Sequence, residues 1–339
     1  MTIRKVDLRY FTIALVPISI FWMHGVISDH IFATDLAVPS AILQEGRHWL
    51  EAAGRFRFIA ATWFFGALAL LAVALVIRDI AGPISRATRI AAIGTLLFIL
   101  YLAMTPTIEQ NASPDAPHVY HRLGADLFES ALSRGNLPGC SGPQDMWLLG
   151  RCGEIPVISL LNRVLDIING LAGLGVGALI VGMILCLERG GGNTREEEAA
   201  QLAQNLVRMR RQLYLSSLIL TFGMFFATSW MYWPLPLVME AERNAYGTVV
   251  LASALFTGTY FCLLILSFYL PVALVLDGRI NRLAQSAAQV SDEGERTDVD
   301  DWMEARGLKF STSDHLRAGF AVTAPILAAF AGGISPIAL

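Results

Sequence analysis

The chain of 339 residues is 55% hydrophobic and only 16% charged, with a mean hydropathy of +0.54, whereas soluble domains carry about 25% charged residues. These values exclude an ordinary soluble protein and indicate an all-α polytopic membrane protein. The 25 basic and 28 acidic residues nearly cancel, so no overall field indicates nucleic-acid binding. Lys5 and Lys309 are the only lysines and neither follows a glycine, which excludes a P-loop.

Charge-free runs long enough to cross a hydrocarbon layer of ~30 Å predict six transmembrane helices. These runs are residues 10–28, 58–77, 90–105, 167–187, 213–238 and 248–276. No small-x-small cleavage site closes the first run, so we interpret it as an uncleaved signal anchor. Most basic residues then fall on the side of the N-terminus, which predicts a cytoplasmic N-terminus.

The same pattern divides the chain into five parts. Residues 1–105 hold the first three spans, 106–155 an extracytoplasmic cap loop, 156–188 the fourth span, 189–291 the fifth and sixth spans, and 292–339 an acidic linker and a hydrophobic segment. Residues 318–339 carry no charge and form either a seventh span or a short helix followed by a buried segment. Pro325, Gly332 and Gly333 disfavour a long helix, so we expect the second arrangement.

Apolar residues at helical spacing continue the fifth and sixth spans beyond the membrane. They are Leu202, Leu206, Met209 and Leu213 before the fifth span, and Leu276, Ile280, Leu283, Ala287 and Val290 after the sixth. Thr194 and Glu197 form a capping box that should start the helix leading into the fifth span. We therefore expect a helical stalk in the cytoplasm, paired either within one chain or between subunits.

Polar side chains inside the predicted spans are the candidates for a conduit. Hydroxyl stripes occur on the fifth and sixth spans, at Ser217, Thr221 and Thr228, and at Ser253, Thr257, Tyr260 and Ser267. Such groups either line a pore or join helices by hydrogen bonds. The other intramembrane polar residues are His24, Asn162, Asp166 and Asn169. Asp166 is either a buried site or an interfacial partner of Arg163, and we favour the interfacial position.

Arginines gather at the base of the predicted stalk, namely Arg208, Arg210, Arg211, Arg279 and Arg282. The tendency of basic residues to face the cytoplasm and lipid headgroups accounts for this cluster. The alternative is that the arginines bind the phosphates of a nucleotide or short oligonucleotide. Aromatic residues are not interleaved with these arginines, so we do not expect sequence-specific recognition of nucleic acid. Cys140 and Cys152 are expected to form a disulfide in the cap loop. No catalytic, metal or cofactor motif is present in the sequence, so we expect none of these.

The C-terminal region carries a weak family likeness. Its residues are Trp302, Gly307-Leu308, Phe310-Ser311, Leu316-Arg317, Ala324-Pro325 and Gly332-Gly333. Together with the multispan body and basic stalk, they resemble transmembrane effector subunits of bacterial anti-phage defence systems, including Hailong-type subunits. The likeness covers about the last forty residues. It implies an oligomeric channel of the bacterial inner membrane that responds to a nucleotide or oligonucleotide signal.

These observations favour a homo-oligomeric gated ion channel or membrane-disrupting effector embedded in the lipid bilayer, not an enzyme. The alternatives are a secondary transporter and a non-catalytic membrane subunit of a larger complex. Two three-span halves that enter from opposite sides would permit an inverted repeat, although the sequence shows no internal similarity.

Overall fold

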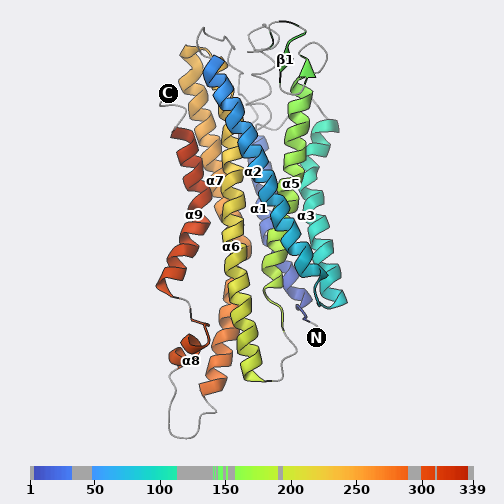
Figure 1. Ribbon diagram of the computed structural model, residues 1–339, viewed down its shortest axis with the longest axis vertical. Coiled ribbons are helices and arrows are strands. Elements are labelled where there is room, and N and C mark those ends of the chain that lie inside the picture. The colour runs from blue at the N-terminus through green and yellow to red at the C-terminus, as the bar shows by residue number, and fades with distance from the viewer. Residues whose placement is uncertain are drawn as a thin grey trace.

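The computed structural model is a bundle of long helices aligned along one axis (Figure 1). It describes residues 4–32, 48–112, 140–151 without 141, 143, 148 and 149, 157–189, 194–288, 299–309 and 311–334. The helices are η1 (Leu8–Ala14), α1 (Leu15–Phe32), α2 (His48–Ala81), α3 (Arg86–Ala112), α5 (Val157–Leu185), α6 (Arg195–Tyr232), η2 (Leu235–Leu237), α7 (Glu240–Ala288), α8 (Val299–Ala305) and α9 (Thr312–Ile334). The strands β1 (Met146–Trp147) and β2 (Gly150–Arg151) pair antiparallel in a minimal hairpin.

Seven helices are long and apolar enough to cross a membrane. They are Leu8–Ile27, Trp49–Ala81, Arg86–Thr105, Arg163–Leu185, Arg195–Leu237, Glu240–Ala287 and Ser313–Gly332. Each of the six runs predicted from the sequence falls within or largely within one of the first six. The seventh, α9, differs from the short helix and separate buried segment that we expected.

Helix α9 continues through Pro325 and Gly332 because its small residues pack closely against α6 and α7. A Cβ atom built on Gly258 of α7 would lie 3.0 Å from the Ile326 Cα and 3.2 Å from the Pro325 carbonyl oxygen. Likewise, a Cβ on Gly332 would lie 3.1 Å from the Thr228 Oγ1 of α6. Close helix contact of this kind stabilises a helix whose residues have poor intrinsic propensity.

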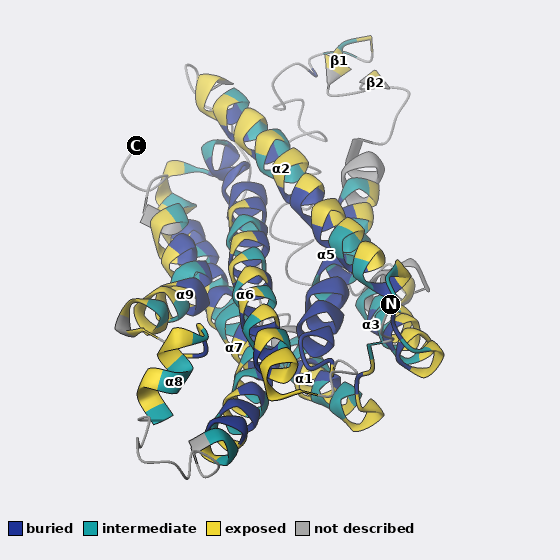
Figure 2. Cartoon of the chain, turned by 60° about the horizontal axis from the view of Figure 1, so that its bottom comes forward, coloured by how far each residue is buried: buried dark blue, intermediate teal, exposed yellow. Residues whose placement is uncertain are grey.

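The helices form two groups of three. On one side α2 and α3 both pack against α5, and on the other α6, α7 and α9 pack against one another; α2 and α5 also contact α6. Helix α1 contacts α7, and η1 lies between α3, α5 and α7. The first three spans and the next three therefore do not form separate bundles. Helix α1 packs against α7, and α5 packs against α2 and α3. The last two turns of α5, which follow Gly177, are buried (Figure 2).

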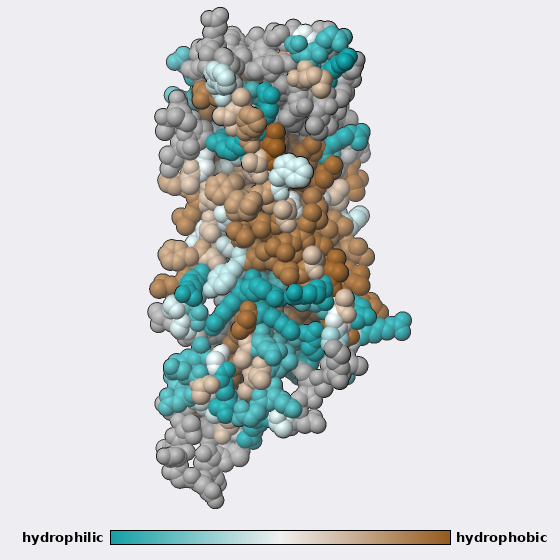
Figure 3. Space-filling view, in the orientation of Figure 1, coloured by the Kyte–Doolittle hydropathy of each residue, from teal (hydrophilic) through white to brown (hydrophobic). Residues whose placement is uncertain are grey.

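The molecule has two chemically different ends. An apolar belt covers its middle, and a polar band lies below the belt in the view of Figure 3. We call the end with this band the arginine-rich end, defined by Arg4, Arg208, Arg211 and Arg279. The opposite end, which holds β1, β2 and the start of α2, is the hairpin end. At the arginine-rich end α6 and α7 extend beyond the other helices of the bundle, with α8 beside them (Figure 1).

Candidate functional site

The candidate site is built where four separate segments meet at the arginine-rich end. Helix α5 ends in a tight turn in which the Glu188 N–H donates to the Leu185 carbonyl oxygen at 3.2 Å. The N-terminal segment then pairs with this turn, because Lys5 and Arg189 exchange backbone hydrogen bonds of 3.2 and 2.7 Å. Arg4 also donates its N–H to the Pro83 carbonyl oxygen at 2.9 Å. The N-terminal segment thus joins the α2–α3 turn to the end of α5.

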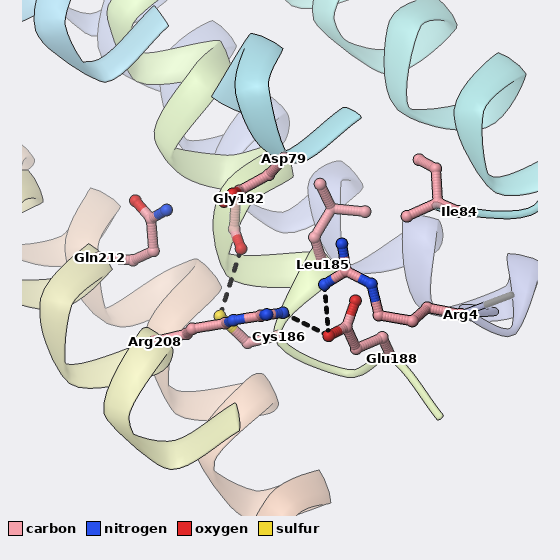
Figure 4. A pocket seen from close by; sticks show the side chains of 9 residues that line it. All are labelled: Arg4, Asp79, Ile84, Gly182, Leu185, Cys186, Glu188, Arg208 and Gln212. Carbon is pink, nitrogen blue, oxygen red and sulfur yellow. Dashed lines mark hydrogen bonds and ion pairs between the residues drawn. The ribbon is translucent and has the colours of Figure 1, made fainter. Parts of the chain in front are cut away.

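The Glu188 carboxylate lies at the centre of this junction and is only 3% exposed. Its Oε1 accepts from Arg4 Nη1 at 2.9 Å and from Arg208 (Figure 4). It also accepts from Gln201 Nε2 at 3.1 Å. Asn205 Nδ2 donates to the Glu188 carbonyl oxygen at 2.9 Å. A buried carboxylate is tolerated when cations and hydrogen-bond donors surround it, as they do here. We call Glu188, Arg4, Arg208, Gln201 and Asn205 the Glu188 junction.

A small cavity adjoins the Glu188 junction, and the space in it that the centre of a water-sized sphere can reach is about 10 Å³. It is lined by Arg4, Asp79, Ile84, Gly182, Leu185, Cys186, Glu188, Arg208 and Gln212 (Figure 4). The Gln212 side chain is 2% exposed, and its Oε1 has no hydrogen-bond partner among the described residues. By this measure a single water molecule needs about 10–15 Å³, so the cavity has room for about one water and is far too small for a nucleotide.

The five arginines predicted at the stalk base have different partners. Arg208 binds Glu188, Arg210 pairs with Asp314 of α9 at 3.0 Å, and Arg211 lies 3.7 Å from Asp79 of α2. The remaining two lie on α7, where Arg279 donates to the Leu187 carbonyl oxygen at 2.8 Å and Arg282 to the carbonyl oxygen of Gly278 at 2.9 Å. Three of the five arginines are therefore paired with carboxylates of this chain.

The two hydroxyl stripes face different neighbours. Thr228 donates to the Met224 carbonyl oxygen at 2.8 Å beside α9, whereas the Tyr260 ring stacks on His24 of α1 at 4.0 Å. Ser217 and Ser267 are buried, and Ser253 and Thr257 are half-buried. The Thr221 Oγ1 is buried and has no hydrogen-bond partner within the described part of the chain. None of these seven residues lines the cavity at the Glu188 junction.

The other predicted polar residues lie far from the Glu188 junction or outside the described residues. His24 also stacks on Phe256 at 5.0 Å, so aromatic packing surrounds it. Asp166 and Asn169 are half-buried near the hairpin end, with Asp166 roughly 33 Å from Glu188 along α5. The interfacial position of Asp166 stays a prediction, and no ion pair between Asp166 and Arg163 is found in the described ranges. The Asn162 side chain is not described.

The cysteines agree with the sequence interpretation as far as they are described. Cys140 is disulfide-bonded, whereas Cys152 lies outside the described residues. Cys186 and Cys262 are free thiols. Within the described ranges no group of three His, Cys, Asp or Glu side chains is arranged to hold a metal ion.

Sequence reasoning missed a second buried carboxylate, Glu51, at the hairpin end. Glu51 is fully buried, pairs with Arg55 Nη2 at 2.6 Å and accepts from Trp233 Nε1 at 2.7 Å. The Phe58 ring lies 5.3 Å from both the Trp230 and Trp233 rings. We call Glu51, Arg55 and Trp233 the Glu51 junction. The sequence does indicate the Glu51–Arg55 ion pair, because the two residues are one helical turn apart.

Comparisons with known proteins find no match to a protein-family model, a curated protein or a solved structure.

Proposed function

We propose that the chain is a gated, homo-oligomeric ion channel or membrane-disrupting effector of the bacterial inner membrane. The observation that carries this proposal is the Glu188 junction, which ties the projecting part of α6 to the N-terminal segment and to the membrane helix α5. Gln201, Asn205 and Arg208 lie on α6 before its apolar section, whereas Glu188 follows the last turn of α5. A displacement of α6 would thus reach α5 directly.

A membrane orientation follows from the charges. Positive residues concentrate at the arginine-rich end, which would face the cytoplasm together with the N-terminus and the projecting ends of α6 and α7. These helices have 38 and 49 residues, or roughly 57 and 73 Å of length. Both exceed the ~30 Å hydrocarbon layer. We infer that their surplus forms the cytoplasmic stalk, paired within one chain by buried Leu206, Met209 and Ile280.

A seventh span is part of this proposal. The Arg210–Asp314 pair and the Thr228–Gly332 contact join α6 to α9 at two levels. The two levels are separated by the same number of residues on both helices, about 27 Å of rise. Helix α9 therefore runs parallel to α6 across most of the apolar belt, and the C-terminus would lie outside the cytoplasm.

The described arrangement fits a closed state. Near the hairpin end, Phe58, Phe226, Trp230 and Trp233 fill the contact between α2 and α6 with stacked and tilted rings. A conduit along this contact is blocked by these rings. Conduction would therefore need either a rearrangement of the two helix groups or a path between subunits.

Flux from liposomes tests the proposal. Glu188→Gln should raise the leak of entrapped ions, because the closed state loses the charge that holds Arg4 and Arg208. A loss of about 1.4 kcal/mol would raise the open population about tenfold. The matched control is Glu196→Gln, which removes an exposed carboxylate paired with Arg306. Absence of conductance in wild type and variant, with or without added nucleotides, in a strictly monomeric particle would reject the proposal.

A secondary transporter is the second candidate, favoured by the division into two groups of three helices. Rocking of one group against the other would open the bundle alternately to either side. A cysteine placed at Asp166 would then change its reactivity with a membrane-impermeant thiol reagent when substrate is added. A channel predicts no such substrate-dependent change.

A further inference from the structure

Arg279 is the most unusual cation of the arginine-rich end. It is 8% exposed, and its Nη1 donates to the Leu187 carbonyl oxygen at 2.8 Å. Its Nε and Nη2 are buried without a hydrogen-bond partner, and no ion pair to Arg279 occurs within the described ranges. A guanidinium removed from water without a counter-charge is costly. The Arg279 guanidinium therefore has two unused hydrogen-bond donors and no counter-charge among the described residues.

Further cations surround Arg279. The Arg9 and Arg279 guanidinium carbons lie 5.3 and 5.2 Å from the centre of the Tyr10 ring. Arg282 lies one helical turn beyond Arg279 and is exposed. The carboxylate near Arg9 is Asp7, paired with it at 2.8 Å. On α7, Asp277 accepts from Asn281 at 3.0 Å.

The other arginines of this end that pair with carboxylates are less available to bind an anion. Arg4 and Arg208 share Glu188, Arg210 binds Asp314 and Arg211 lies near Asp79. An incoming anion would have to displace a carboxylate from each of them. Arg279 and Arg282 have carbonyl oxygens as their hydrogen-bond partners, so an anion adds a counter-charge there without breaking an ion pair.

We propose that Arg279 and Arg282 of α7, beside the Tyr10 ring of η1, bind a phosphate group at the cytoplasmic membrane surface. A guanidinium presents paired N–H donors that match phosphate oxygens, and the free Nε and Nη2 of Arg279 form such a pair. The phosphate comes either from an anionic lipid headgroup of the inner leaflet or from a soluble phosphate. The inference concerns binding and does not depend on whether the chain conducts ions.

Binding to the purified full-length protein tests the site. Retention of phosphatidylglycerol is compared with that of phosphatidylcholine by native mass spectrometry, and inorganic phosphate is titrated separately. Arg282→Gln should weaken phosphatidylglycerol binding about fivefold, and Arg279→Gln at least as much. The control Arg86→Gln, an exposed arginine of α3, should change binding less than about twofold.

The variants distinguish the two phosphate sources. Loss of phosphatidylglycerol binding in the Arg279 and Arg282 variants supports the lipid source, whereas Arg279-dependent binding of inorganic phosphate alone supports the soluble source. Arg279→Lys should bind more weakly than wild type because it keeps the charge and loses the paired donors. Because Arg282 is exposed, Arg282→Gln should melt like wild type and serve even where Arg279→Gln fails to fold. Equal retention of both lipids without phosphate binding, or an equal loss in Arg86→Gln, would overturn the proposal.

Discussion

The two buried glutamates, one at each end of the bundle, are held in different ways. Glu51 binds Arg55 one turn away on its own helix and the indole of Trp233. Glu188 binds arginines that are 184 and 20 residues distant in the chain, together with Gln201 of α6. The Glu51 junction is thus partly local to α2, whereas the Glu188 junction exists only when the N-terminal segment, α5 and α6 come together.

This difference assigns different mechanical roles to the two ends. At the hairpin end, the aromatic rings of Phe58, Phe226 and Trp230 pack α2 against α6, so we expect a change in charge at Glu51 to leave this packing in place. At the arginine-rich end, Glu188 is the group shared by three segments, and Asp79 and Asp314 bind neighbouring arginines of α6. We expect the free energy of unfolding to depend on side-chain charge at the arginine-rich end and on side-chain volume at the hairpin end.

The largest expected effect is that of Glu188→Ala. Removing one partner of a buried ion pair costs about 3–5 kcal/mol, and we expect about 3 kcal/mol because the Arg4 and Arg208 side chains are 19% and 31% exposed. Denaturant unfolding in detergent micelles measures the change in free energy. Exposed Glu196→Ala is the control and should leave the midpoint unchanged. A loss below about 1 kcal/mol would show that Glu188 does not hold the segments together.

Glu51→Gln should have a smaller effect, about 1–2 kcal/mol. The amide oxygen still accepts from Trp233 Nε1, while Arg55 loses its counter-charge. Arg55 is 23% exposed and can turn toward water, which limits the loss. Removing both charges in Glu51→Gln/Arg55→Gln should recover part of the stability, as the double-mutant cycle measures. An effect as large as that of Glu188→Ala would contradict the contrast between the two ends.

The sequence predicts the features that depend on neighbours in the chain. The apolar runs locate six of the seven long helices, and the capping box of Thr194 and Glu197 is confirmed at the start of α6. Leu202, Leu206 and Met209 of the predicted apolar seam are buried, whereas the cytoplasmic stalk itself stays a prediction. Each of these signals lies within a few residues, where helical periodicity suffices to interpret it.

The features that the sequence could not predict depend on distant segments. In the sequence Glu188 is a single acidic residue at the end of a long apolar run. Its partner Arg4 is 184 residues away, so no local pattern predicts the contact. Helix α9 was expected to break because Pro325 and Gly332 lower helix propensity, yet Gly258 and Thr228 supply close contacts from other helices. Similarly, the arginines of the stalk base form a cluster in sequence, and only the structure separates the carboxylate-bound Arg208 from the incompletely bonded Arg279.

The smallest expected effect concerns the Arg210–Asp314 pair, which joins α6 to α9 with side chains 29% and 17% exposed. Asp314→Asn keeps an acceptor for the Ser311 N–H, now 3.1 Å from the carboxylate, and removes only the charge. Partly exposed pairs contribute about 0.5 kcal/mol. A double-mutant cycle with Arg210→Gln should therefore give a coupling of about this size. The equivalent cycle of Arg208→Gln with Glu188→Gln should give at least about 2 kcal/mol because Glu188 is buried. Equal couplings would mean that burial of Glu188 does not strengthen its ion pairs, and the Glu188 junction would then be no better suited to transmit a displacement of α6 than any other contact at the arginine-rich end.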